Sequence, residues 1–171
     1  MNFLNKIIEL IKSVFKQEET PIQKEADFNG VQEILNNLVV GDIIWAKITP
    51  CMQNGKSAIL TNLVNGKGYG STEFHVVRIK SSDVLPQYIY TLLRHFDVLS
   101  DAKKYFTGSA GQQRVPTSYL ENLLIPVPPL EVQKQIVDEY ASSIELAKQG
   151  YIKIYNYKQE LKKNFENQIF E

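Results

Sequence analysis

The sequence predicts an α+β protein of mixed type, in which a small, mostly antiparallel sheet with flanking helices precedes a long C-terminal coiled-coil-type helix. Three observations predict this fold. Short apolar runs, separated by Gly and Asn, follow one another closely between residues 41 and 79. Apolar residues then recur with a helical period over 86–99, and a heptad pattern occupies 130–171.

Composition narrows the possible roles. The 171 residues include 19 basic and 19 acidic side chains, so attraction to nucleic acid or anionic lipid requires a local basic surface. The single cysteine, Cys51, excludes an internal disulfide and is expected to be a packing residue. Two distant histidines give a metal ion little to bind. Since no run approaches the ~18 apolar residues of a membrane span, we expect a cytoplasmic protein without a membrane partner.

The first forty residues are expected to be an appendage. Residues 1–18 place apolar side chains at helical spacing opposite several lysines, which indicates an amphipathic helix that docks on its own core or on a partner. Attachment to a membrane surface is the less favoured alternative. Residues 19–40 are predicted to be a linker and lead-in, in which 31–40 forms a short helix or an irregular segment.

Residues 41–129 are predicted to form the main domain. Strands are expected over 43–48, 57–63, 72–79 and 123–127. Asn-Gly and other Gly-containing turns separate the first three. Pro86 suits the first turn of a helix, so 86–99 is expected to be one helix. A proline-rich segment that ends at Pro129 stops the last strand before the next helix begins.

Residues 130–171 are predicted to form one long helix that pairs with a second helix. At 1.5 Å per residue this helix makes an arm of roughly 60 Å, which is too long to bury its seam on the preceding domain. The seam occupies heptad positions a and d, with Gly150 and Lys158 as imperfections. Its apolar members, expected to contact the partner helix, are Val137, Tyr140, Ile144, Ala147, Tyr151, Ile154, Leu161 and Phe165.

The sequence contains only weak signals of catalysis. Gly55-Lys56-Ser57 is like the end of a phosphate loop, but the first glycine of that motif would fall at Pro50, and a strand follows instead of a helix. Glu73 and His75 lie two apart on one strand face, as an acid–base pair would, although a structural pair is the favoured interpretation. No catalytic or metal-ligating residue is therefore predicted.

The strongest functional signal is the donor loop, residues 107–114, with the sequence TGSAGQQR. Two glycines free its backbone, while Gln112, Gln113 and Arg114 carry the donors that bridge adenine or guanine edges or clamp phosphates. An equally favoured alternative is that these side chains tie the loop to the last strand. Basic residues outnumber acidic ones over 31–80, which suggests additional phosphate contacts there. The further candidate DNA contacts are Ser109 in the loop and Lys47, Lys56 and Lys67 in the domain.

Four blocks, in this order, resemble the specificity subunit of type I restriction–modification enzymes. They are GDIIWAKITPCMQNGKSAI at 41–59, GYGSTEFHVVRIK at 68–80, TGSAGQQRVP at 107–116 and NLLIPVPPLEVQKQI at 122–136. The resemblance implies a target recognition domain of mixed α/β type that reads half of a split DNA sequence, followed by a spacer helix. It also implies that the helices pair antiparallel and dock methyltransferase subunits. S-adenosylmethionine, ATP and magnesium would then serve the partner subunits, and this chain would carry neither cofactor nor catalysis.

The chain departs from the family pattern in two ways. A full subunit has two recognition domains and two long helices, whereas this chain has one of each, so it is expected either to pair with a copy of itself or to be a truncated remnant. Only residues 19–40 stand where the family carries a longer variable section.

Two hypotheses for the function follow. The leading one is sequence-specific recognition of double-stranded DNA, as a specificity subunit that directs partner methyltransferase and restriction subunits. The alternative is an assembly protein that does not read DNA and docks on a methyltransferase or a full-length specificity subunit through its helices.

Overall fold

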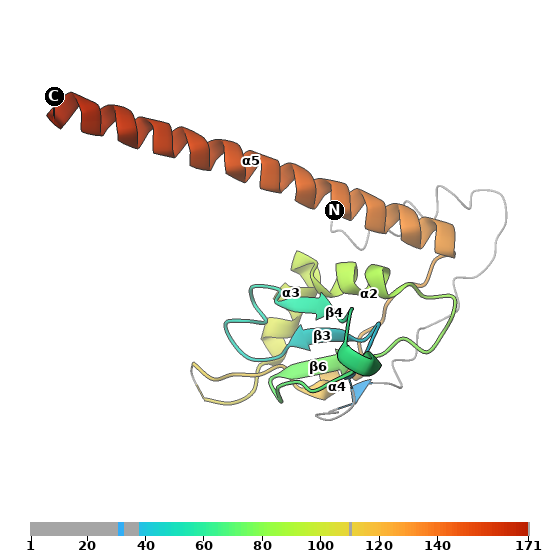
Figure 1. Cartoon of the computed structure of the whole chain (residues 1–171). Coiled ribbons are helices and arrows are strands. Elements are labelled where there is room, and N and C mark those ends of the chain that lie inside the picture. Colours follow the sequence, from blue (N-terminus) through green and yellow to red (C-terminus); the bar gives the residue numbers. More distant parts are fainter. Residues whose placement is uncertain (1–30, 33–37, 110, 171) are drawn as a thin grey trace. The chain divides into compact units, whose positions relative to one another are not determined.

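The structure, a computed structural model, describes residues 31–32, 38–109 and 111–170. The amphipathic helix expected at 1–18 and most of the linker expected at 19–40 lie outside these residues. The chain divides into two compact units between Lys134 and Gln135. All strands of the described residues belong to the first unit, and the second unit is part of one long helix (Figure 1).

Four short antiparallel strands form the central sheet. In spatial order they are β1 (Val31–Gln32), β6 (Phe74–Val77), β3 (Ile43–Ala46) and β4 (Ser57–Ile59). Trp45 of β3 pairs with His75 of β6 on one side and with Ser57 of β4 on the other. A separate ribbon pairs β2 (Leu38–Val39) with β5 (Lys67–Gly68), which follows the short 3-10 helix η1 (Val64–Gly66). The predicted α+β class, with a small antiparallel sheet, is confirmed.

The lead-in at 31–40 is not the predicted helix or irregular segment where the structure describes it. Val31 pairs with Val77 of β6, and Leu38 pairs with Gly68 of β5. Both partners come later in the chain. A local sequence pattern could not reveal these strands, because each exists only through pairing with a distant segment.

The single helix predicted over 86–99 is two helices, α2 (Pro86–Leu93) and α3 (Phe96–Ala102). Pro86 does occupy the first turn of α2, as predicted. The break comes at His95, whose backbone is extended at φ −67° and ψ 142° and whose ring Nδ1 accepts the Asp97 N–H at 3.3 Å. His95 therefore caps a new helix, which continues into the 3-10 helix η2 (Lys103–Tyr105).

The strand predicted over 123–127 is absent, and a short helix, α4 (Thr117–Glu121), precedes that segment. Proline has no backbone N–H, so Pro126, Pro128 and Pro129 cannot extend a strand ladder. A side chain bonds to this segment instead, since the Tyr88 hydroxyl donates to the Pro126 carbonyl at 2.8 Å. The segment is thereby attached to α2.

The core lies between one face of the sheet and the short helices. Trp45 is fully buried, and its indole N–H donates to the Leu93 carbonyl of α2 at 3.1 Å. Its ring stacks on Tyr119 of α4, whose hydroxyl donates to the Val98 carbonyl of α3. Figure 1 shows α2 beside β4, which agrees with their contacts. The buried core also includes Ile43, Val77, Tyr88, Ile89, Leu92 and Leu120.

Asp42 lies in the turn predicted for Gly41 and Asp42, directly before β3 begins, and it stabilises this end of the sheet. Its carboxylate is fully buried and accepts two bonds from Arg78, to Oδ1 at 2.7 Å and to Oδ2 at 2.8 Å. The Val39 N–H donates to Oδ2 at 2.8 Å. A buried carboxylate needs such partners, and here they join the ends of β2, β3 and β6.

The long helix α5 (Leu130–Phe170) is formed as predicted. Much of its apolar seam is exposed, with Tyr151 at 70%, Ile154 at 59% and Phe165 at 63%. Val137 and Tyr140 are partly buried. None of the helices in the described ranges is both long enough and apolar enough to cross a membrane.

Gln133, in the first turns of α5, is a buried clamp that the sequence pattern did not reveal. Its amide nitrogen donates to the carbonyls of Asp83 and Pro128, each at 2.7 Å. Its amide oxygen accepts the Leu85 N–H at 2.8 Å. Leu85 is the residue that caps α2. The start of α5 is thus joined to the start of α2 and to the proline-rich segment.

The clamp predicts a large asymmetry between two glutamines of α5. Gln133→Leu keeps the side-chain volume but leaves the Leu85 N–H and the carbonyls of Asp83 and Pro128 without this partner. One buried polar group left unsatisfied costs about 1–3 kcal/mol, so the free energy of unfolding should fall by at least that amount. Urea titration followed by the fluorescence of buried Trp45 measures it. Gln135→Leu is the control, because Gln135 is exposed and bonds to exposed Glu139. Equal losses in the two variants would contradict the clamp.

Candidate nucleic-acid interface

The donor loop is closed by a backbone pair between its first and last residues. The Thr107 N–H donates to Arg114 O at 3.0 Å, and the Arg114 N–H donates to Thr107 O at 2.9 Å. Within the loop, Gly108 has φ +105°, and a Cβ added there would lie 3.2 Å from Gln112 O. This position therefore requires glycine both for its backbone angle and for space.

The loop is joined to the chain that follows β3. The Thr49 N–H donates to Gln113 O at 2.9 Å, and the Val115 N–H donates to Lys47 O at 3.0 Å. Ile48 and Arg114 form an isolated β-bridge between these two segments. The alternative in which the loop is tied to a last strand over 123–127 is therefore wrong about the partner, because the loop pairs with residues 47–49.

Arg114 forms a bidentate ion pair with Glu73. Its Nε lies 2.9 Å from Oε2 and its Nη2 lies 2.8 Å from Oε1, while Nη1 donates to Gln112 O at 2.7 Å. The Arg114 hydrogen bond lowers the pKa of Glu73, and the nearby charges of Arg114 and Lys47 act in the same direction. Glu73 in turn raises the pKa of Arg114 through the same hydrogen bond. We call this contact the Glu73/Arg114 ion pair.

The candidate lysines do not all gather at the loop. The Lys47 N–H donates to Glu73 O at 3.0 Å, so Lys47 lies beside the ion pair. Lys56 lies near the end of β3 beside Lys47, because its carbonyl accepts the Ala46 N–H at 2.9 Å. Lys67 pairs with Val39, which comes before β3, whereas Lys47 follows β3. Lys67 is therefore at the other end of that strand from Lys47.

The candidate loop side chains differ in exposure. Ser109 and Gln112 are exposed, and the Ser109 carbonyl accepts the Gln112 N–H at 3.1 Å. Gln113 and Arg114 are partly buried. The backbone of the loop is thus held by internal bonds, while the Ser109 and Gln112 side chains are accessible to a ligand.

Glu73 and His75 do not form the acid–base pair that their spacing allowed. The Glu73 carboxylate is bonded to Arg114, and His75 is 2% exposed. The His75 Nε2–H donates to the Val115 carbonyl at 2.8 Å, and the ring stacks on Trp45. Both residues have structural partners. Within the described ranges, no three His, Cys, Asp or Glu side chains are grouped so that they could hold a metal ion.

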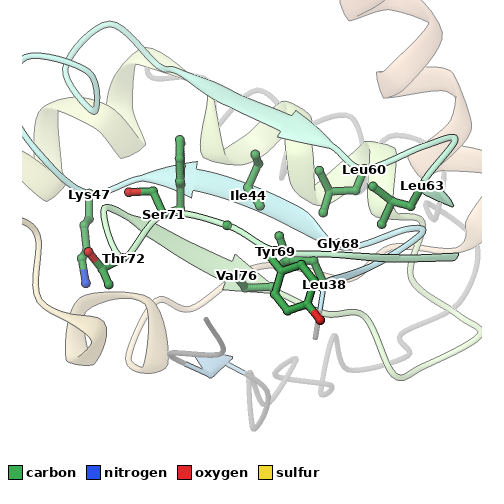
Figure 2. A pocket seen from close by; sticks show the side chains of 12 residues that line it. Leu38, Ile44, Lys47, Leu60, Leu63, Gly68, Tyr69, Ser71, Thr72 and Val76 are labelled. Carbon is green, nitrogen blue, oxygen red and sulfur yellow. The ribbon is translucent and has the colours of Figure 1, made fainter. Parts of the chain in front are cut away.

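A pocket of about 330 Å³ lies on the sheet face opposite Trp45 (Figure 2). Ile44 and Val76, which alternate with Trp45 and His75 along their strands, form its floor. Figure 2 shows Lys47, Ser71 and Thr72 at one end and Leu38, Gly68 and Tyr69 at the other. The lining is mainly apolar, and base edges are read by donors and acceptors. The donor loop is therefore the better candidate for nucleic-acid contact.

Sequence reasoning missed the role of Glu73, because it considered this residue only as a neighbour of His75. Its partner, Arg114, is far along the chain, and no spacing rule links the two. The one available signal was chemical. An acid next to an apolar strand and an arginine ending a glycine-containing loop can satisfy each other, and the fold brings them together.

Comparison with known proteins gives consistent matches. A family model described as the type I restriction modification DNA specificity domain matches residues 6–154. The EcoAI and EcoEI type I restriction enzyme specificity subunits of Escherichia coli are 42% and 45% identical to this chain over 109 residues. A putative MjaX type I restriction enzyme specificity subunit of Methanocaldococcus jannaschii is 32% identical over 99 residues.

These matches cover unequal shares of the proteins. Each Escherichia coli match covers 64% of this chain and 18% of the relative, and the Methanocaldococcus jannaschii match covers 58% and 23%. The chain therefore spans about a fifth of the length of these curated relatives.

The Glu73/Arg114 ion pair predicts a pH dependence of stability. The pKa of Glu73 is lowered from its ordinary value of 4.5, so its contribution is present above that value and disappears as pH falls through the folded-state pKa. The difference in melting temperature between the unsubstituted protein and Glu73→Gln should be small, because the pair is open to solvent, and it should be present at neutral pH and vanish in strong acid. Glu121→Gln, at the exposed end of α4, is the control and should show no such change. A Glu73→Gln effect that is independent of pH would disprove the prediction.

Proposed function

This chain belongs to the type I restriction modification DNA specificity domain family, and from that premise we propose that it recognises double-stranded DNA in a sequence-specific manner. It acts as the specificity subunit that directs partner methyltransferase and restriction subunits to their site. The observation that carries the proposal is the donor loop, whose backbone is fixed by internal hydrogen bonds while the Ser109 and Gln112 side chains are exposed.

The loop suits base recognition on chemical grounds. A glutamine amide offers a donor and an acceptor side by side, which matches the N6 and N7 edge of adenine. The backbone of Gln112 is bonded to Ser109 and Arg114, and that of Gln113 to Thr49. A loop that is already ordered loses less conformational entropy when it binds. Gln112, Gln113 and Ser109 are therefore the proposed base-directed contacts.

Phosphate contacts are proposed for the lysines of the domain. Lys47 and Lys56 lie near the donor loop, at the end of β3, and Lys67 lies at the far end of that strand. Lysine acts as a point charge toward phosphate and carries no sequence information. A spread of lysines along the domain would follow a DNA backbone, with Lys47 closest to the bases that the loop reads.

The proposal leaves catalysis to the partner subunits. Glu73 and His75, the two residues whose spacing allowed an acid–base pair, serve structural contacts instead. The methyltransferase subunit would bind S-adenosylmethionine, and the restriction subunit would bind ATP and magnesium. This chain would recognise the DNA site and attach the partner subunits there, without binding a cofactor itself.

The exposed seam of α5 supports pairing with another helix. Several apolar side chains of the seam, at heptad spacing, are between 37% and 70% exposed: Ile144, Tyr151, Ile154, Leu161 and Phe165. An apolar stripe of this length is stabilised when a second helix covers it. We propose a second copy of the chain as that partner, because two copies would supply two recognition units and two helices.

The same seam favours a second candidate function. The chain would be an assembly protein that docks on a methyltransferase or on a full-length specificity subunit through α5, without reading DNA. Co-purification with such a subunit, together with the absence of DNA binding by the complex, would select this function over the first.

The DNA proposal predicts a steep dependence of affinity on salt. Each neutralised phosphate contributes a slope of about −0.9 to log affinity against log salt concentration. Lys47→Gln should make that slope shallower by about one, whereas Lys163→Gln, on exposed α5, should leave it unchanged. Fluorescence anisotropy with mixed-sequence duplexes over a salt series gives the slopes. Affinity that is flat across the series, or undetectable, would refute DNA recognition.

The pairing proposal predicts a difference between two neighbouring isoleucines. Ile154 lies in the seam and Ile152 lies outside it, yet they are similarly exposed, at 59% and 55%. Ile154→Asp should convert a dimer to a monomer because it places a charge in the seam, while Ile152→Asp should remain a dimer. Light scattering after size exclusion gives the mass. A monomeric unsubstituted protein, or identical masses for the two variants, would rule out self-pairing through this seam.

A further inference from the structure

The guanidinium of Arg114 already forms hydrogen bonds with other residues of the protein. Its Nε and Nη2 are bonded to the two oxygens of Glu73, and its Nη1 is bonded to Gln112 O. A guanidinium has its strongest mode of recognition in a planar, two-point contact with a carboxylate, a phosphate or a guanine edge. Arg114 uses that mode on Glu73. Three of its five N–H donors are thereby used, and a DNA contact through the other two would have to form beside the Glu73 carboxylate.

The electrostatics around Arg114 also disfavour direct phosphate contact. The Glu73 carboxylate lies 2.8 Å from Nη2, and its pKa is lowered by this contact, so it is charged at neutral pH. The pair has no net charge. A phosphate that approached Arg114 would meet the carboxylate as well, and like charges repel at this range.

Stability alone gives a poor account of the pair. The side chains of Arg114 and Glu73 are 38% and 32% exposed, and ion pairs open to solvent add little to the free energy of unfolding. The pair instead fixes the positions of the residues around it. Arg114 is held to Glu73 at the start of β6, to Thr107 through the backbone, and to Gln112 through Nη1. The carbonyl of the residue between, Gln113, is held by Thr49.

We infer that Arg114 is a positioning residue, and that the Glu73/Arg114 ion pair sets the geometry in which Gln112 and Gln113 meet the bases. Arg114 does not contact the DNA itself. This inference rests on the proposed function, since it assigns a role within the same recognition surface. It also makes Glu73, an acid in a DNA-binding surface, a requirement for specificity.

If the ion pair positions the two glutamines, Glu73→Gln and Arg114→Lys should have the same effect on DNA recognition. Arg114→Lys keeps the positive charge but loses the two-point contact with Glu73 and the bond from Nη1. Glu73→Gln keeps the arginine but removes the charged acceptor. Both should reduce the preference for the selected sequence over random duplex by about tenfold, as loss of a base-directed contact does. The double variant should lose no more than either single variant, because the same pair is broken in each.

The experiment uses the full chain and a duplex pool with a randomised segment. Selection with the unsubstituted protein defines its consensus, and affinities for the consensus and for random duplex are then measured over a salt series. Gln112→Ala with Gln113→Ala gives the reference for lost base reading. Glu145→Gln, which removes an exposed ion pair with Lys148 on α5, is the control and should keep both preference and slope. Melting temperatures confirm that every variant is folded at the temperature of the assay.

The salt slope separates positioning from direct contact. A positioning residue lowers the preference and leaves the slope unchanged in Glu73→Gln, Arg114→Lys and the double variant. Direct phosphate contact by Arg114 would instead keep the Arg114→Lys slope and preference, and Glu73→Gln would tighten binding by freeing the arginine. That result overturns the inference while DNA recognition stands. If the unsubstituted protein selects no sequence, the proposed function fails, and the inference fails with it.

Discussion

The fold depends most on how Val115 is held. This residue is 1% exposed, its N–H donates to Lys47 O, and its carbonyl accepts from the buried His75 ring. A buried peptide unit without such partners would be costly, so the chain leaving the donor loop is fixed to the ends of β3 and β6. Arg114 immediately precedes this anchor and meets Glu73 there. Helix α4 begins shortly afterwards and brings Tyr119 onto Trp45.

The parts of the fold that follow from local pattern were predictable, and the parts that follow from distant pairing were not. The strands around Trp45 and His75 and the long helix α5 carry their periodicity in the sequence. The break at His95 depends on a ring that bonds to the backbone, which periodicity does not encode. The absent strand at 123–127 was an apolar run beside prolines. Its Pro126 carbonyl instead accepts a hydrogen bond from the Tyr88 side chain.

The candidate site, too, was predictable only in part from the sequence. Residue chemistry pointed to Gln112, Gln113 and Arg114 as a group, and the structure places them in one hydrogen-bonded loop. Chemistry alone could not separate a side chain that meets a ligand from one that shapes the loop. That distinction needs the position of Glu73, which no spacing rule connects to residue 114. The same holds for Gln133, whose three bonds reach residues before α2 as well as its own proline-rich segment.

Trp45 has a practical consequence for studies of this chain in solution. It is the one tryptophan in the sequence, it is fully buried, and it contacts α2, β6 and α4 at once. Its fluorescence emission will shift to longer wavelength when water reaches the indole, which happens when these elements separate. The described part of α5 carries no tryptophan. Emission therefore follows the unfolding of the first compact unit, whereas far-ultraviolet circular dichroism is dominated by the long helix, and comparison of the two signals tells whether the units melt together.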